Sequence, residues 1–271
     1  MEHNKKKLFQ CLGLSLLVVF IGLASGIILS ATPLGNTLNN SDIAAQTVNT
    51  LSRVLMSVFL IFIVKKLYGL KIGFQKENLG KGIFIYGILI VFVTVFQVVS
   101  NYQTPDLTLG KAMPIILLYL LFNLAIGLFE EVLCRGVLFN AFRKYYGESR
   151  KGIYLATFIS SFVFGSLHLI NLIGNSGIIV ATIAQVIYAT LFGVLFCVIY
   201  YRSGNLLSCI ILHGVFDLTD VFWKCFSNNR MQLIEISNST DLSFVEAGII
   251  ILICSSFLIS ALVQLRKEFD S

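Results

Sequence analysis

Residues 115–139 read IILLYLLFNLAIGLFEEVLCRGVLF, an apolar stretch with two adjacent glutamates and one arginine in its second half. A helix crosses a bilayer with about 20 apolar residues, so this stretch is long enough to span a membrane. A charged side chain deep in the membrane costs about 2.5–3.5 kcal/mol on insertion scales, so Glu130, Glu131 and Arg135 need a reason. Glu131 and Arg135 are four residues apart and can pair on one helix face. Glu130 has no partner in this stretch, which makes it the first candidate for a functional residue.

The composition of the whole chain also indicates a membrane protein. Of its 271 residues, 56% are hydrophobic and 13% are charged, and the mean hydropathy is +0.86. Soluble domains carry about 25% charged residues. Long apolar stretches and only three prolines favour helices over a barrel of short alternating strands. We therefore predict an all-α polytopic membrane protein, with residues 1–271 forming one integral membrane domain in the lipid bilayer and no nucleic-acid partner.

The apolar stretches give a topology of eight spans, at residues 8–31, 46–64, 82–100, 113–141, 153–172, 178–201, 205–223 and 247–265. The first is too long for the apolar region of a signal peptide, so we expect it to be retained. With the N-terminus inside, fifteen Lys and Arg residues fall on inner segments and only three on outer loops. We therefore expect both termini in the cytoplasm and a polar, irregular outer loop over about residues 224–246. Arg53 and Arg135 remain within spans.

Most of the other ionisable residues within the spans lie on two further helices. His168 follows Phe164 by one turn in the fifth predicted span, and His213 and Asp217 share one face of the seventh. One such residue is most simply a hydrogen-bonding partner between helices. Five or six of them confined to three helices favour a functional site. The cysteines form no CxxC pair, so the sequence supports neither a redox motif nor a zinc ribbon.

A carboxylate and two histidines within a membrane can hydrolyse an amide bond. The carboxylate can act as a general base towards water, one histidine can assist it, and the other can donate hydrogen bonds to an oxyanion. No serine, threonine or cysteine is obviously paired with a base, so water is the expected nucleophile. The same residues could instead hold zinc, although the HExxH signature is absent. The sequence leaves the metal open, with the candidate ligands Glu130, His168, His213 and Asp217.

Three motifs occur in order on separate apolar helices. Residues 130–135 have the form EExxxR, residues 164–168 the form FxxxH, and residues 213–217 the form HxxxD. In this order, within about residues 113–223, they resemble the CAAX protease and bacteriocin-processing family of intramembrane proteases. That family, also called CPBP or Abi, includes the type II CAAX prenyl endopeptidases. The resemblance implies a catalytic core over residues 113–223.

The resemblance also implies a role for each matching position. Glu130 is expected to activate water with the help of His168, and His213 with the residue four positions later to stabilise the oxyanion. A common form of the pattern has asparagine where this chain has Asp217. An ionised aspartate would repel an oxyanion, so Asp217 must be protonated, orient His213 or bind a metal. Family members have been described as metalloproteases, and a metal-free glutamate mechanism is the competing account.

The other motif positions, Glu131, Arg135 and Phe164, are expected to support these residues. The family implies a membrane-associated peptide or protein as the substrate, and its eukaryotic members trim prenylated C-termini. Frequent Ile, Asn and Lys are typical of a low-GC Gram-positive bacterium, so we expect a small peptide substrate and a bacterial plasma membrane. Two alternatives stay open: a catalytically silent membrane regulator or bacteriocin-immunity protein, and a proton-coupled transporter. The sequence contains no convincing internal repeat, which disfavours the transporter.

Overall fold

The computed structural model describes residues 2–30, 32–39, 41–173, 176–228 and 242–270. Within these ranges the protein is 87% helical and has no strand, as the sequence predicts. The only β-type contact there is an isolated bridge between Phe74 and Asn205. Most of the expected outer loop at residues 224–246 lies outside the described residues, so its structure stays a prediction.

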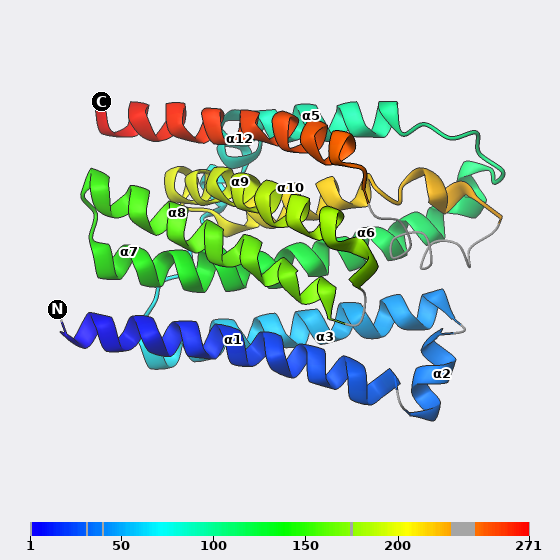
Figure 1. Ribbon diagram of the computed structural model, residues 1–271, viewed down its shortest axis with the longest axis horizontal. Helices are drawn as coiled ribbons and strands as arrows, with labels where there is room; N and C mark the ends of the chain where they lie inside the picture. The colour runs from blue at the N-terminus through cyan, green and yellow to red at the C-terminus, as the bar shows by residue number, and fades with distance from the viewer. Residues whose placement is uncertain (1, 31, 40, 174–175, 229–241, 271) are drawn as a thin grey trace.

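The described helices are α1 (Glu2–Ser30), α2 (Pro33–Asn39), α3 (Asp42–Ile63), η1 (Val64–Tyr68), η2 (Lys76–Asn78), α4 (Leu79–Lys81), η3 (Gly82–Tyr86), α5 (Ile88–Ser100), α6 (Leu109–Glu131), η4 (Val132–Phe139), α7 (Asn140–Tyr146), α8 (Arg150–Leu167), η5 (His168–Leu172), η6 (Ser176–Ile178), α9 (Ile179–Ser203), α10 (Leu206–Leu218), η7 (Trp223–Phe226) and α12 (Phe244–Asp270). Among the short segments, η1, η3 and η4 are π-helices, and η2, η5, η6 and η7 are 3-10 helices. They form three layers, with α1 and α3 on one side, α6 to α10 in the middle, and α5 and α12 on the other side (Figure 1).

Several of these helices are long and apolar enough to cross a membrane. Within the described residues there are five, at Asp42–Lys66, Leu109–Tyr146, Arg150–Leu172, Ile179–Ser203 and Phe244–Asp270. Lys76–Tyr86 and Ile88–Ser100 meet at 63° and form a sixth if the bent pair is one span. Each of the eight predicted spans overlaps a helix, but α10 has only 13 residues, fewer than a crossing needs. The chain is an integral membrane protein, and eight crossings stay a prediction.

Both ends of the chain lie at one end of the bundle, which we call the basic end. Figure 1 shows α1 beginning, α12 ending and α7 turning into α8 there, while α2 lies at the opposite end. Two ion pairs tie α12 to this end: Arg150 with Asp270 and Arg202 with Glu268, both at 3.0 Å. The basic residues of the α7–α8 turn and of both termini therefore gather on one side of the molecule.

The chain between η1 and η2 passes the start of α10, and we call residues 70–75 the inner clamp. Leu206 N–H donates to the carbonyl of Gly73 at 2.9 Å, and the Tyr200 hydroxyl accepts from Gly73 N–H at 3.1 Å. Asn205 also donates to the carbonyl of Gln75. Gly73 permits this approach, because a Cβ there would collide with the carbonyl oxygen of Gly204. The clamp buries Leu70 and Ile72.

Close contact between α6 and α10 positions the site. A Cβ on Gly127 would lie 2.9 Å from the carbonyl oxygen of Ile210, and one on Gly214 would lie 2.8 Å from Leu124 Cα. Small residues let membrane helices approach to backbone contact in this way. Because Gly127 and Gly214 each lie close to a charged motif residue, the approach brings the first and third motifs together.

Candidate active site

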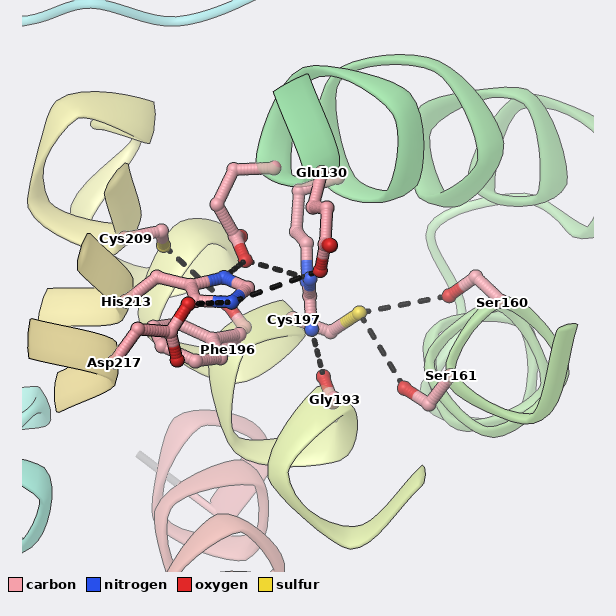
Figure 2. Close-up of polar contacts among 11 residues, drawn as sticks. Glu130, Ser160, Ser161, Gly193, Phe196, Cys197, Cys209, His213 and Asp217 are labelled. Atoms are coloured by element: carbon pink, nitrogen blue, oxygen red, sulfur yellow. Dashed lines mark hydrogen bonds and ion pairs between the residues drawn. The ribbon is translucent and has the colours of Figure 1, made fainter. Parts of the chain in front are cut away.

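A buried chain of three side chains joins the first motif to the third. Arg135 Nη1 donates to Glu131 Oε1 at 2.7 Å, and His213 Nδ1 lies 2.8 Å from the same oxygen (Figure 2). Glu131 and Arg135 are fully buried, and the His213 side chain is 7% exposed. The ion pair expected from the i,i+4 spacing is therefore formed. The sequence did not indicate that its carboxylate also holds His213.

The contact with Glu131 fixes the proton on one nitrogen of His213. A carboxylate paired with arginine is an acceptor only, so Nδ1 of His213 must carry a proton and donate it. The other nitrogen, Nε2, faces two carboxylates: Asp217 Oδ2 at 3.4 Å and Glu130 Oε2 at 3.6 Å. Both distances exceed the 2.7–3.2 Å range of N–H···O hydrogen bonds. Nε2 therefore makes no normal hydrogen bond to either carboxylate. His213 and Asp217 lie on the same face of α10, as the sequence predicts.

Aromatic rings and a backbone carbonyl complete the surroundings of Arg135. Its Cζ lies 4.9 Å from the ring centre of Phe164 and 5.0 Å from that of Phe196, and Nη2 donates to the carbonyl of Gly193 at 3.2 Å. A Cβ on Gly193 would approach the same Nη2 to 3.3 Å, so glycine leaves room for the guanidinium. Ring faces attract a cation, and this attraction offsets part of the cost of burying the charge.

The imidazole of His213 is held by two rings of α9. Phe196 stacks on it at 5.5 Å and 22°, and Phe192 meets it edge-on at 6.4 Å. The sequence analysis missed Phe192, Gly193 and Phe196. α9 is apolar along nearly its whole length, so no residue pattern distinguishes these three from ordinary core residues. Only the packed structure identifies them.

Helix η4, which carries Arg135, is a π-helix of eight buried residues. It follows Glu131 directly and continues the long helix that begins with α6. π-helical segments inside α-helices are rare and occur frequently at functional sites. The π-helical segment therefore overlaps the second part of the first motif, which ends at Arg135.

A cavity of about 540 Å³ opens on the other side of Glu130, bounded by α1, α3, α6, α8 and η5. Its lining includes Glu130, His168 and Phe164 from the motifs, together with Arg53 and apolar residues such as Met56. His213 and Asp217 are not among the lining residues. Glu130 thus lies between the cavity and the His213 cluster, and its side chain is 28% exposed.

His168 begins η5 directly after α8 and is half-buried. Phe164 meets its ring edge-on at 5.2 Å, as the spacing predicts, and Nδ1 lies 3.4 Å from the carbonyl oxygen of Phe164. The structure brings His168 and Glu130 to the same cavity. It gives them no hydrogen bond to each other within the described residues.

The metal alternative was tested against the described residues. No group of three or more His, Cys, Asp or Glu side chains is arranged there to hold a metal ion. Glu130, His213 and Asp217 converge, but His168 does not join them and Nδ1 of His213 is occupied by Glu131. As arranged, these residues do not fit a zinc ligand shell.

Together, the fold and this cluster define an integral membrane protein with a buried acid–histidine site next to an open cavity. Residues 112–219 match the family model described as Type II CAAX prenyl endopeptidase Rce1-like. The matched segment contains all three motifs, and the match confirms their resemblance to the CAAX protease family. Its members are proteases. No curated protein and no solved structure matches the chain.

Proposed function

We propose that the protein is an intramembrane endopeptidase that hydrolyses a peptide bond of a membrane-associated peptide by means of an activated water. One observation carries the proposal. Glu130, the carboxylate of the first motif, lines the 540 Å³ cavity while its oxygen faces His213 Nε2 at 3.6 Å. A substrate in the cavity can therefore reach a carboxylate backed by an acid–histidine cluster.

Glu130 is the proposed general base. Water attacks the carbonyl carbon of the scissile bond, and its proton passes to the Glu130 carboxylate. The tetrahedral intermediate then collapses, the C–N bond breaks, and Glu130 returns the proton to the leaving amine. His168 assists from across the cavity, where it can orient the water. This division of roles uses the two motif side chains that line the cavity.

His213 is the proposed donor to the oxyanion. Because Nδ1 already donates to Glu131, Nε2 can donate only when the ring is doubly protonated. The carboxylates of Glu130 and Asp217 at 3.6 and 3.4 Å stabilise the positive charge of the doubly protonated ring. Asp217 acts by orienting His213, and the Arg135–Glu131 pair fixes the ring from the other side. The arrangement then stabilises the negative charge that develops on the carbonyl oxygen of the scissile bond.

We propose that residues 1–271 form one membrane domain around a catalytic core at residues 113–223. One hydrophobic cluster with members from Leu8 to Leu265 supports a single domain. The start of α1 and the end of α12 lie at the same end of the bundle (Figure 1). This arrangement supports an even number of crossings with both termini in the cytoplasm. The proposed membrane is a bacterial plasma membrane, and the proposed substrate is a small peptide.

Cysteine labelling tests the topology. A single cysteine at Gln103 should react with an impermeant maleimide from outside intact cells, and one at Glu148 only after permeabilisation. Both positions are exposed in the structure. Labelling with the opposite sidedness at both sites would invert the proposed orientation.

The activity is tested with purified wild type, Glu130→Gln and Glu148→Gln in detergent micelles. Each protein is incubated with a library of apolar peptides, with and without a chelator, and the products are identified by mass spectrometry. Glu148 is the matched control because it is a surface carboxylate paired with Arg143 at 2.8 Å. We expect cleavage by the wild type and Glu148→Gln, and none by Glu130→Gln. Equal cleavage by all three would disprove the role of Glu130.

A further inference from the structure

The cavity beside Glu130 has a polar wall formed by α3. Asn49, Ser52, Arg53 and Met56 all line it and follow one another at the spacing of a single helix face. Arg53 is the only lysine or arginine among the described lining residues. This part of α3 lies outside residues 112–219, so the family match says nothing about it.

Arg53 forms no ion pair or hydrogen bond with a carboxylate among the described residues, although Glu130 acts on it electrostatically. Nη1 donates to the carbonyl of Asn49 at 3.3 Å, and Cζ lies 5.2 Å from the ring centre of Phe122. A guanidinium has five N–H donors, so most of them are free to bind a ligand. Arginine within a membrane span almost always pairs with another group. The half-buried Arg53 therefore presents unused binding capacity to the cavity.

Arg53 and Glu130 line the same cavity and interact electrostatically. The ring of Phe122 below Arg53 belongs to a residue that precedes Glu130 by eight positions on α6, about 12 Å along the helix axis. A peptide in the cavity can therefore place an anionic group at Arg53 while its scissile carbonyl lies near Glu130. Arginine matches the two oxygens of a carboxylate with two parallel hydrogen bonds.

We infer that Arg53 is a specificity-determining residue that binds the C-terminal carboxylate of the peptide in the cavity. The inference rests on the proposed function, because it assumes that this cavity receives the peptide. A cavity of about 540 Å³ is in the size range of small-ligand pockets, about 300–1,000 Å³. It therefore suits the end of a peptide better than a chain that continues through it. The apolar remainder of the lining would take the side chains.

A binding measurement tests the inference without turnover. An apolar hexapeptide with an N-terminal fluorescein is made with a free C-terminal carboxylate and as its carboxamide. Its affinity for the Glu130→Gln protein in detergent micelles is measured by fluorescence anisotropy. We expect the carboxylate form to bind at least tenfold more tightly. We expect Arg53→Gln in the same background to remove that preference and Arg53→Lys to retain part of it.

Lys66→Gln is the matched control. The Lys66 ammonium also lies 5.2 Å from a phenyl ring centre, that of Phe62, at the end of the same membrane-spanning segment and outside the cavity lining. This change should leave the tenfold preference intact. A loss of preference in the control would show a general effect of charge at this side of the protein and overturn the inference.

Two further arms identify other sources of the anion. A carboxamide peptide with one internal glutamate tests a side-chain carboxylate, and micelles doped with phosphatidylglycerol test a lipid phosphate. The inference is overturned if the Glu130→Gln protein binds the carboxylate and carboxamide peptides equally well, or if it binds neither peptide. This comparison requires no change at Arg53. Binding restored by the internal glutamate, or blocked by the lipid with no carboxylate preference, also overturns it. Preference without cleavage by the wild type would instead contradict the proposed function.

Discussion

Arg135 and Arg53 carry the same side chain into the membrane, but the two sides of the molecule treat it differently. Arg135 is fully buried, lies between two phenyl rings and binds Glu131 at 2.7 Å. Arg53 lies over one ring, is half-buried and lines a cavity, and it forms no ion pair with a carboxylate in the part of the chain that the structure describes. On the α6–α9–α10 side the arginine is thus enclosed by packed protein, whereas on the α1–α3 side the arginine lines a cavity that a ligand can enter. Glu130 lies at the boundary between them.

The largest expected effect is at that boundary. Glu130→Gln keeps the shape of the side chain but cannot accept a proton, so peptide cleavage should fall by about 10²–10⁴-fold, the usual contribution of a general base. The melting temperature in micelles should stay near that of the wild type, because the Glu130 side chain makes no hydrogen bond within the normal distance range to any other described residue. Normal cleavage by this variant would contradict the role of Glu130 as general base. Failure to fold would mean that Glu130 is needed for stability, as is expected of the buried Glu131.

The two arginines should separate in stability. Arg135→Ala leaves Glu131 buried without its countercharge, and breaking a buried pair on one side typically costs about 3–5 kcal/mol. Arg53→Ala breaks no ion pair among the described residues and should cost far less. Thermal unfolding of both variants in the same detergent measures the difference. Equal destabilisation would mean that Arg53 is as structural as Arg135.

A smaller effect is expected where α6 and α10 touch. In Gly214→Ala the new methyl group would lie 2.8 Å from Leu124 Cα, and overpacking of this kind usually costs about 1–3 kcal/mol. Gly248→Ala on α12 is the control, because no other group approaches within 4 Å of a Cβ there. Reduced activity should accompany the loss of stability only in Gly214→Ala. Unchanged stability would show that the helices can separate without harm.

The smallest expected effect is at Asp217. Asp217→Asn keeps a side-chain oxygen facing His213 Nε2, and at 3.4 Å the change removes no strong hydrogen bond, so cleavage should stay within about tenfold of the wild type. Initial rates for both proteins, with and without added zinc, measure this. A dead variant rescued by zinc would instead make Asp217 a metal ligand.

The sequence predicted the helical class and the local pairs because both depend on spacing along one helix. Glu131 with Arg135 and Phe164 with His168 follow from four-residue separations. The bond from Glu131 to His213 could not be predicted, because it depends on how closely α6 and α10 pack. The 63° bend between η3 and α5 could not be predicted from the sequence either, because hydropathy gives no information about the direction of a helix axis.

The roles of the motif residues came from family resemblance and stay proposals. The structure adds a distinction that the motifs do not contain. Glu130 and His168 line the cavity, whereas Glu131 and Arg135 lie behind it. Aromatic partners on α9 were unpredictable, because one apolar residue on a buried helix looks like any other in sequence.

The inner clamp bears on the membrane as an electrical barrier. An acidic cluster that admits water also offers a route for protons, and α10 reaches from the basic end to His213 in only seven residues. The clamp ties the start of that helix to Gly73, and it carries the buried side chains of Leu70 and Ile72. Ile72 in turn packs against Gly136 of η4. We therefore expect the packed clamp to limit proton leak between the basic end and the His213 cluster.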